Sequence, residues 1–175
     1  MPGMLVNGEW KTERQWKNTD GRFVRSETSF RDWISADGSS GFPAEPGRYH
    51  LYVAWACPWA HRTAIMRKLK GLEEVIGLSA VGSNMGEDGW AFHNEPGVIP
   101  DTVNGAGYLR EVYSKADPDY TGRVTTPVLW DKRRVPSSTT SRARSSACST
   151  PSSASSLPQT HISSLRICEL RPTRP

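Results

Sequence analysis

The sequence predicts an α/β fold, and three observations support that class. Residues 48–56 and 74–81 are short runs rich in aromatic and β-branched residues, as buried strands are. A basic segment with a helical apolar period lies between the two runs. A third apolar run, 125–131, follows a long stretch rich in Gly, Asp and Pro. Strand, helix and strand in succession indicate a sheet with a helix packed on it.

The segment after the first strand is predicted to be a helix that begins at Pro58. Proline suits the first helical turn, because its missing N–H would have no partner there. Ile65, Leu69 and Leu72 recur at i, i+4 and i+7, and this spacing predicts the buried face of the helix. Gly71 is the expected stop, since glycine readily adopts the left-handed conformation that ends many helices.

One more strand, one more helix and a final strand are expected after this helix. The strand is EVIGLSAV (74–81), the helix is NGAGYLREVYSKA (104–116), and the final strand is TTPVLWD (125–131). This order fits the beginning of a thioredoxin-like fold. Residues 1–48 keep no helical or alternating period and contain turn-rich pieces such as NGEW and SADGSSGFPAEPG. We expect there an extended arm that pins Trp and Phe side chains onto the core.

The chain therefore divides into three segments. Residues 1–48 are the extended arm, 49–133 are a partial thioredoxin-like domain, and 134–175 are a tail. In the tail, 16 of the 28 residues from 137 to 164 are Ser or Thr and follow no period. Such a composition predicts disorder, because it offers too little apolar surface to bury.

Charge and cysteine content narrow the classes of partner and compartment. Up to Asp131 there are 14 Lys and Arg against 17 Asp and Glu, whereas the remaining residues carry 8 against 1, so the net charge of +4 belongs to the tail. No apolar run reaches the ~18 residues of a transmembrane helix, and no secretory signal is seen. Cys57, Cys148 and Cys168 share no metal-binding spacing. We expect a cytoplasmic protein with free thiols that binds no metal, nucleic acid or membrane.

Cys57 stands where the first strand gives way to the helix, in the sequence ACPWAH. A helix N-terminus favours negative charge and therefore the thiolate, which is the nucleophilic form of cysteine. Ala60 occupies the position of a resolving thiol, so an outside thiol would have to complete a reaction cycle. An inert cysteine packed at a strand end is the alternative. His61 is either a base or a surface histidine.

Pro127, in TTPVLW, is the second candidate for the site. Thioredoxin-like folds place a cis-proline beside the reactive cysteine, and the preceding residue offers its backbone N–H and C=O to a peptide-like thiol. We expect Thr126 to have that role and the Thr126–Pro127 bond to be cis. A trans proline at the start of a strand is the alternative, since only ~5–6% of X–Pro bonds are cis.

Five segments together resemble one family, the Xi-class glutathione transferases or glutathionyl-hydroquinone reductases. They run almost without a break from about Phe30 to Lys132, and they are FRDWI, GFPAEPGRYHLYVAWACPWAHRT, RKLKGLEEVIGLS, GEDGWAF and IPDTVNGAGYLREVYSKADPDYTGRVTTPVLWDK. The resemblance implies a thioredoxin-like N-terminal domain that binds glutathione, an all-α C-terminal domain and a homodimer.

The resemblance also implies a reaction and a set of binding residues. The Cys57 thiolate would attack the sulfur of a glutathionyl-hydroquinone, release the hydroquinone, and form a mixed disulfide that a second glutathione resolves. Trp90 would stack near glutathione, and Arg123 would pair with one of its carboxylates. The complete implied glutathione-binding set is Trp90, Arg123, Val124, Thr126 and Pro127, with Thr126 standing where the family usually has Val.

Other interpretations stay open at this stage. Without the resemblance, Trp90 would be a core tryptophan and Arg123 a solvated loop charge. The related Omega class suggests a glutathione-dependent thiol transferase or dehydroascorbate reductase instead of a hydroquinone reductase.

After VLWDK the sequence departs from the family, which continues into a hairpin strand and a helix that opens with Glu-Ser-Ser. This chain has VPSSTTSRARSSACSTPSS instead. Codons exist for Ser137–Ser149 whose bases, read from one position earlier, encode Ile/Val-Val-Asn-Asn-Glu-Ser-Ser-Glu-Ile-Ile-Arg-Met-Leu. We therefore expect the tail from about Arg134 to be translated out of frame. A genuine Ser/Thr-rich disordered tail is the alternative.

A shifted frame has predictable consequences. It removes the fourth strand and third helix of the thioredoxin-like domain, the Glu and Ser anchors of glutathione, and the family's all-α C-terminal domain. It leaves an exposed sheet edge, counts against the homodimer, and removes any role for Cys148 and Cys168. Two hypotheses follow: the intact gene product is a glutathione-dependent oxidoreductase, and this chain is either an impaired form of it or a non-catalytic truncated product.

Overall fold

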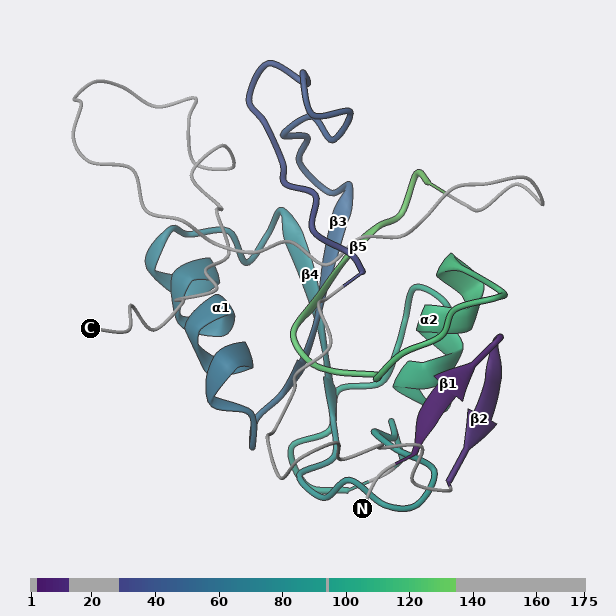
Figure 1. Cartoon of the computed structure of the whole chain (residues 1–175). Coiled ribbons are helices and arrows are strands. Elements are labelled where there is room, and N and C mark those ends of the chain that lie inside the picture. The colour runs from purple at the N-terminus through teal and green to yellow at the C-terminus, as the bar shows by residue number, and fades with distance from the viewer. Residues whose placement is uncertain (1–2, 13–28, 94, 135–175) are drawn as a thin grey trace, which may run out of the picture.

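The computed structural model describes residues 3–12, 29–93 and 95–134 (Figure 1). Within these ranges the chain forms five strands and two helices. In chain order they are β1 Met4–Val6, β2 Glu9–Lys11, β3 Tyr49–Ala54, α1 Pro58–Leu69, β4 Ile76–Val81, α2 Leu109–Ala116 and β5 Val128–Asp131. The α/β class and the thioredoxin-like beginning expected from the sequence are confirmed.

The three longer strands form one mixed sheet in the order β4-β3-β5. β3 runs parallel to β4, with Tyr49 opposite Ile76, and antiparallel to β5, with Tyr52 opposite Val128. All three strands were expected from the sequence. Within the described residues β5 occupies one edge of the sheet.

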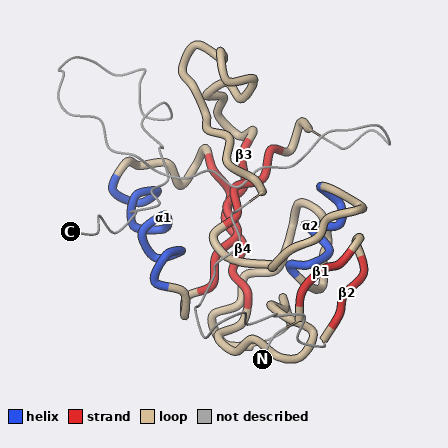
Figure 2. Tube along the Cα trace, in the orientation of Figure 1, coloured by secondary structure: helices blue, strands red, loops and turns tan. Residues whose placement is uncertain are grey.

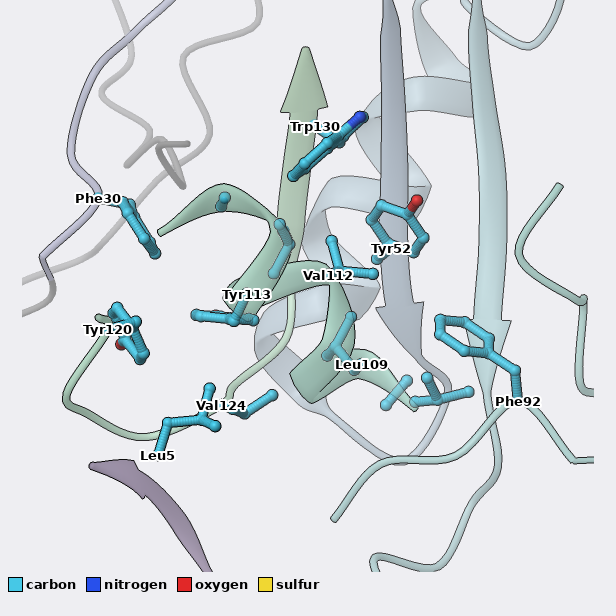
Figure 3. Close-up of a cluster of buried hydrophobic side chains, with 14 residues drawn as sticks. Leu5, Phe30, Tyr52, Phe92, Leu109, Val112, Tyr113, Tyr120, Val124 and Trp130 are labelled. Carbon is cyan, nitrogen blue, oxygen red and sulfur yellow. The ribbon is translucent and has the colours of Figure 1, made fainter. Parts of the chain in front are cut away.

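The sheet separates two hydrophobic clusters, because alternate residues of a strand point to opposite faces. Tyr49, Leu51 and Val53 of β3 belong to the cluster on the α1 side. Tyr52 and Ala54 belong to the cluster on the α2 side, shown in Figure 3, which also contains side chains from β1, α2 and the segment before β5. In Figure 1, α1 and α2 accordingly lie on opposite sides of the strands.

The prediction for α1 was correct in its start but wrong in its buried face. Ile65 is 55% exposed and Leu69 is 75% exposed, and Leu72 is buried only after the helix has ended. The helix instead turns the small side chains Ala60 and Thr63 toward the sheet, because they allow the backbone to approach closely. Larger apolar side chains are left on the outer face.

Two residues, Arg67 and Gly71, determine how α1 ends and how the chain continues into β4. Arg67 donates from Nε to the carbonyl of Ile76 at 2.6 Å and from Nη2 to that of Glu73 at 2.9 Å. Gly71 has φ +62°, the left-handed conformation expected of it, and its N–H bonds the carbonyl of Lys68. The end of α1 is therefore joined to the start of β4 by hydrogen bonds from Arg67, whereas the sequence predicted apolar contacts from Ile65 and Leu69.

The second helix is shorter than the predicted 104–116, because a carboxylate captures the backbone before it. Asp101 Oδ1 accepts the N–H groups of Val103 and Asn104, and Oδ2 accepts that of Ala106. These bonds fold 101–106 into a loop and so compete with a helix. These residues belong to the long loop between β4 and α2, which Figure 2 shows in tan.

The first residues form a hairpin that the sequence interpretation did not include. β1 and β2 pair antiparallel around Asn7-Gly8, whose φ angles of +49° and +76° suit a two-residue turn. Leu5 exchanges backbone hydrogen bonds with Gly122, which attaches the hairpin to the segment before β5. The expected pinning of aromatic side chains is seen at Phe30 and Phe42, both buried, whereas Trp33 is 53% exposed.

The predictions of a disordered, frame-shifted tail fall almost entirely on residues 135–175, which lie outside the described ranges. The same holds for the expected loss of the fourth strand and third helix. Among the described helices, neither has the length and apolar character needed to cross a bilayer.

Candidate functional site

Cys57 is the residue on which α1 begins. Its backbone is extended, with φ −93° and ψ 114°, and Pro58 follows in the first turn of the helix. The Cys57 N–H bonds the carbonyl of Ala54 at 3.0 Å, and its carbonyl accepts the N–H of His61 at 3.1 Å. The side chain makes no capping hydrogen bond, so only the backbone of Cys57 takes part in the start of the helix.

The thiol lies against the residue that precedes the cis-proline. Cys57 Sγ donates to the carbonyl oxygen of Thr126 at 3.5 Å, and the Thr126–Pro127 bond is cis, as expected from the sequence. The Thr126 side chain is buried, and its Oγ1 has no hydrogen-bond partner among the described residues. Two segments 69 residues apart thus meet at the sulfur.

Two tyrosines that the sequence interpretation overlooked hold the segment before Pro127. The Tyr113 hydroxyl, on α2, donates to the carbonyl of Thr125 at 2.9 Å and accepts its N–H at 3.3 Å. Burial raises the pKa of Tyr113, which keeps its hydroxyl protonated and able to donate. The Tyr120 hydroxyl donates to the carbonyl of Arg123 at 3.1 Å. Phe30, from the arm, packs against both rings (Figure 3): its ring centroid lies 5.8 Å from that of Tyr113 and 5.2 Å, stacked, from that of Tyr120.

Trp90, Val124 and Cys57 border the same hydrophobic cluster. Val124 is a buried member of the cluster, whereas Trp90 and Cys57 are partly buried and pack against it. The Trp90 carbonyl accepts the N–H of Leu109 at 2.9 Å, which ties the tryptophan to the start of α2. Arg123 is half-buried directly before Val124. Cys57, Trp90 and Val124 therefore pack on the cluster that α2 covers, and Cys57 also borders the cluster on the α1 side.

A second group of side chains surrounds the N-terminal turns of α1. The Arg62 guanidinium lies 4.6 Å from the centroid of the Trp59 ring, and its buried Nη1 has no hydrogen-bond partner among the described residues. Trp55 donates from Nε1 to the carbonyl of Gly97 at 2.8 Å and lies 6.4 Å from the ring of His61. His61 is exposed, and no described contact joins it to the sulfur of Cys57.

His50, in the middle of the sheet, is a buried neutral histidine. Burial lowers its pKa to about 4. Its Nε2 lies 2.8 Å from Ser79 Oγ, and Ser79 donates in turn to the carbonyl of Pro100, so Nε2 carries the proton. Because His50 Nε2 and the Ser79 hydroxyl both make hydrogen bonds within the fold, His50 and Ser79 have a structural role.

The arrangement can support thiol chemistry on a peptide-like ligand. A sulfur at a helix N-terminus is a nucleophile in its thiolate form, and the peptide groups beside a cis-proline can bond an extended backbone. Within the described ranges no cluster of three or more His, Cys, Asp or Glu side chains suited to a metal ion is found.

Comparison with known proteins identifies relatives that are glutathione transferases or glutathionyl-hydroquinone reductases. The family described as glutathione S-transferase, N-terminal domain, matches residues 56–143. Glutathionyl-hydroquinone reductase PcpF from Sphingobium chlorophenolicum is 55% identical over 133 residues, covering 74% of this chain and 41% of the relative. Glutathione S-transferase omega-like 2 from Schizosaccharomyces pombe is 51% identical over 118 residues, covering 67% and 37%.

The similar solved structures are also glutathione transferases. The Xi class glutathione transferase from Natrialba magadii has a TM-score of 0.66 at 49% identity, covering 75% of this chain and 39% of that one. The glutathione-bound structure of YqjG, a glutathione transferase homolog from Escherichia coli K-12, has a TM-score of 0.63 at 47% identity, with the same coverage. This chain therefore spans about 40% of the length of the proteins it resembles.

Proposed function

Because this chain belongs to the glutathione S-transferase family, in its Xi class, we propose that Cys57 takes the glutathionyl group from a glutathionylated hydroquinone. One observation carries the proposal: the Cys57 sulfur lies at the start of α1, 3.5 Å from the carbonyl that precedes the cis-proline.

The reaction has two steps, and in each of them a thiolate attacks a sulfur atom. In the first, the Cys57 thiolate attacks the sulfur of the glutathionyl-hydroquinone, and the carbon–sulfur bond breaks. Its electron pair remains on the ring carbon, which takes up a proton to give the hydroquinone, while Cys57 becomes a mixed disulfide with glutathione. In the second, a glutathione thiolate attacks that disulfide, forms oxidised glutathione, and releases the Cys57 thiolate.

The remaining residues would bind the tripeptide. The backbone of Thr126 would bond the cysteinyl part of glutathione, with Val124 and Pro127 forming the floor beneath it. Trp90 would stack against the ligand, and Arg123 would pair with one of its carboxylates. The clustering of Trp90, Val124 and Cys57 on one hydrophobic cluster supports this division of roles.

The test is the appearance of a glutathione adduct on Cys57. A background with Cys148→Ser and Cys168→Ser leaves one thiol in the chain. Mixed with a glutathionyl-hydroquinone, this protein should gain the mass of one glutathionyl group and release the hydroquinone, and a Cys57→Ser variant should do neither. Hydroquinone release that persists in Cys57→Ser would refute the proposal, and so would an unmodified Cys57 in a folded protein.

A second candidate is a glutathione-dependent thiol transferase or dehydroascorbate reductase. The similarity to an omega-like transferase from Schizosaccharomyces pombe favours it. Both functions use Cys57, but they differ in the bond attacked. Faster reaction with a glutathionyl mixed disulfide or with dehydroascorbate than with the glutathionyl-hydroquinone would favour this candidate.

A further inference from the structure

The turn directly before Trp90 is rich in glycine, and residues 86–88 are exposed while Gly89 is buried. Gly86 and Gly89 form an antiparallel bridge, and the Gly89 N–H bonds the carbonyl of Gly86 at 3.1 Å. Gly89 has φ +86°, a conformation that side chains rarely adopt. A turn of this composition gains little from its own packing, so contacts from elsewhere must hold it.

Trp10, on β2, holds one side of this turn. Its Nε1 donates to the carbonyl of Glu87 at 3.0 Å, although the two residues are 77 positions apart. Its ring also lies directly against Gly89, since a Cβ added there would come within 3.0 Å of a ring carbon. A side chain at Gly89 would therefore displace the tryptophan.

Arg110, on α2, holds the other side. Its Nη1 donates to the backbone carbonyl of Asp88 and, at 2.9 Å, to the Asp88 carboxylate. The guanidinium carbon lies 5.3 Å from the centroid of the Trp10 ring and 4.2 Å from that of Tyr108. Cation–π attraction thus links the two residues that hold the turn.

The backbone after the turn is fixed in the same way. The Trp90 carbonyl accepts the N–H of Leu109, and Ala91 forms an antiparallel bridge with Tyr108. The backbone of Trp90 is thus held on one side by the 86–89 turn and on the other by the start of α2. The 86–89 turn, which Trp10 and Arg110 hold, therefore fixes the position from which the Trp90 side chain leaves the backbone.

We propose that Trp10 and Arg110 are positioning residues of the glutathione site, which act by clamping the 86–89 turn and orienting Trp90. The amino-terminal hairpin then contributes to the site through Trp10, which lies on β2. The inference rests on the proposed contact between Trp90 and glutathione. It adds two residues whose described contacts are with the 86–89 turn, Tyr108 and each other.

The test compares two reagents on the single-thiol background with Cys148→Ser and Cys168→Ser. Oxidised glutathione transfers a glutathionyl group to the Cys57 thiolate and leaves as a glutathione thiolate. Methyl methanethiosulfonate transfers a methylthio group and leaves as methanesulfinate, with no glutathione part to be recognised. The ratio of the two rates, followed by intact mass, therefore reports recognition of glutathione rather than exposure of the sulfur.

Trp10→Leu and Arg110→Met should each lower this ratio about tenfold, because a displaced Trp90 no longer positions the tripeptide. The rate with methyl methanethiosulfonate should stay within about twofold, as for a surface substitution. Arg110→Lys should restore part of the ratio, since the ammonium can still pair with Asp88. Lys115→Met, at an exposed position on the same helix, should change neither rate.

The double variant should lose less than the product of the two single losses, because both residues act on one turn. If Trp10→Leu does not fold, Trp10→Phe takes its place, since it keeps a ring against Gly89 and removes the donor to Glu87. Full retention of the ratio in these variants would overturn the inference alone. A parent protein whose rate ratio is no higher than that of a free small thiol with the same two reagents would overturn the proposed function, and the clamp with it.

Discussion

The two helices contact the same sheet in opposite ways. On α2, Leu109, Val112, Tyr113 and Ala116 are all buried, and the hairpin, Phe30 and the segment before β5 complete their surroundings. On α1 only Ala60 and Thr63 are buried, and Trp59, Ile65 and Leu69 are exposed.

This difference shows that the two sides of the sheet contribute differently to stability and to the candidate site. On the α2 side, residues far apart in the chain meet and hold the backbone next to Cys57. The α1 side supports the N-terminus of the helix through a close backbone approach, without burying its large side chains. We therefore expect substitutions on the α2 side to affect both stability and the site, and those on the outer face of α1 to affect neither.

The largest expected effect is that of Leu109→Ala. Leu109 is fully buried in the first turn of α2, so its truncation removes apolar contacts and leaves a cavity. We expect the free energy of unfolding to fall by about 2–5 kcal/mol. Urea denaturation followed by tryptophan fluorescence measures this change, and a loss below about 1 kcal/mol would mean that the α2 side is not a packed core.

The next effect concerns His50, which faces the α2 side. Its pKa is lowered from 6.5 to about 4, mainly by burial; Asp101 raises it, and Lys132 and Arg67 lower it further. Between these two pH values the unfolded chain binds a proton that the folded chain does not, so stability falls as the pH falls from about 6.5 to about 4.

His50→Gln removes this proton while keeping a donor for Ser79. The loss of stability over this pH range should therefore be about 3 kcal/mol smaller in the variant than in the parent protein, on the usual conversion of a pKa difference. Parallel denaturation curves at several pH values provide the measurement. Equal slopes of stability against pH in both proteins would show that His50 is not held neutral by burial.

Tyr113→Phe should have a moderate effect on stability and a specific one on the site. The substitution removes the hydroxyl that bonds both the carbonyl and the N–H of Thr125, at a cost of about 1 kcal/mol, since Thr125 is exposed and water can replace the lost partner. Because Thr125 precedes the residue that contacts Cys57, glutathionylation of Cys57 should also become slower. A slower reaction without any loss of stability, or the reverse, would separate the two roles.

The smallest effect is expected for Leu69→Ala, which is chemically the same change as Leu109→Ala. Leu69 is exposed on the outer face of α1, and alanine is a better helix former than leucine, so the free energy of unfolding should change by less than about 0.5 kcal/mol. A loss as large as that of Leu109→Ala would mean that something covers this face in solution.

Much of the site could be predicted from local chemistry. The position of Cys57 before Pro58 indicated a helix start, and the context of Pro127 led to the correct expectation of a cis bond. The hairpin was missed although Asn7-Gly8 is a strong local signal for one, because the flanking strands are only three residues long. The buried face of α1 was predicted wrongly because apolar spacing was weighed above side-chain size.

The sequence by itself determined the strands of the sheet, the start and stop of α1 with Cys57 directly before it, and the family. These follow from composition, period and short-range backbone preferences, which act within a few residues. Only the tertiary structure decided that Tyr113 holds Thr125, that Asp101 shortens α2, and that Trp10 and Arg110 clamp the turn before Trp90. Such contacts depend on which side chains meet once the sheet has formed, and no local pattern encodes a meeting of residues as far apart as Trp10 and Glu87.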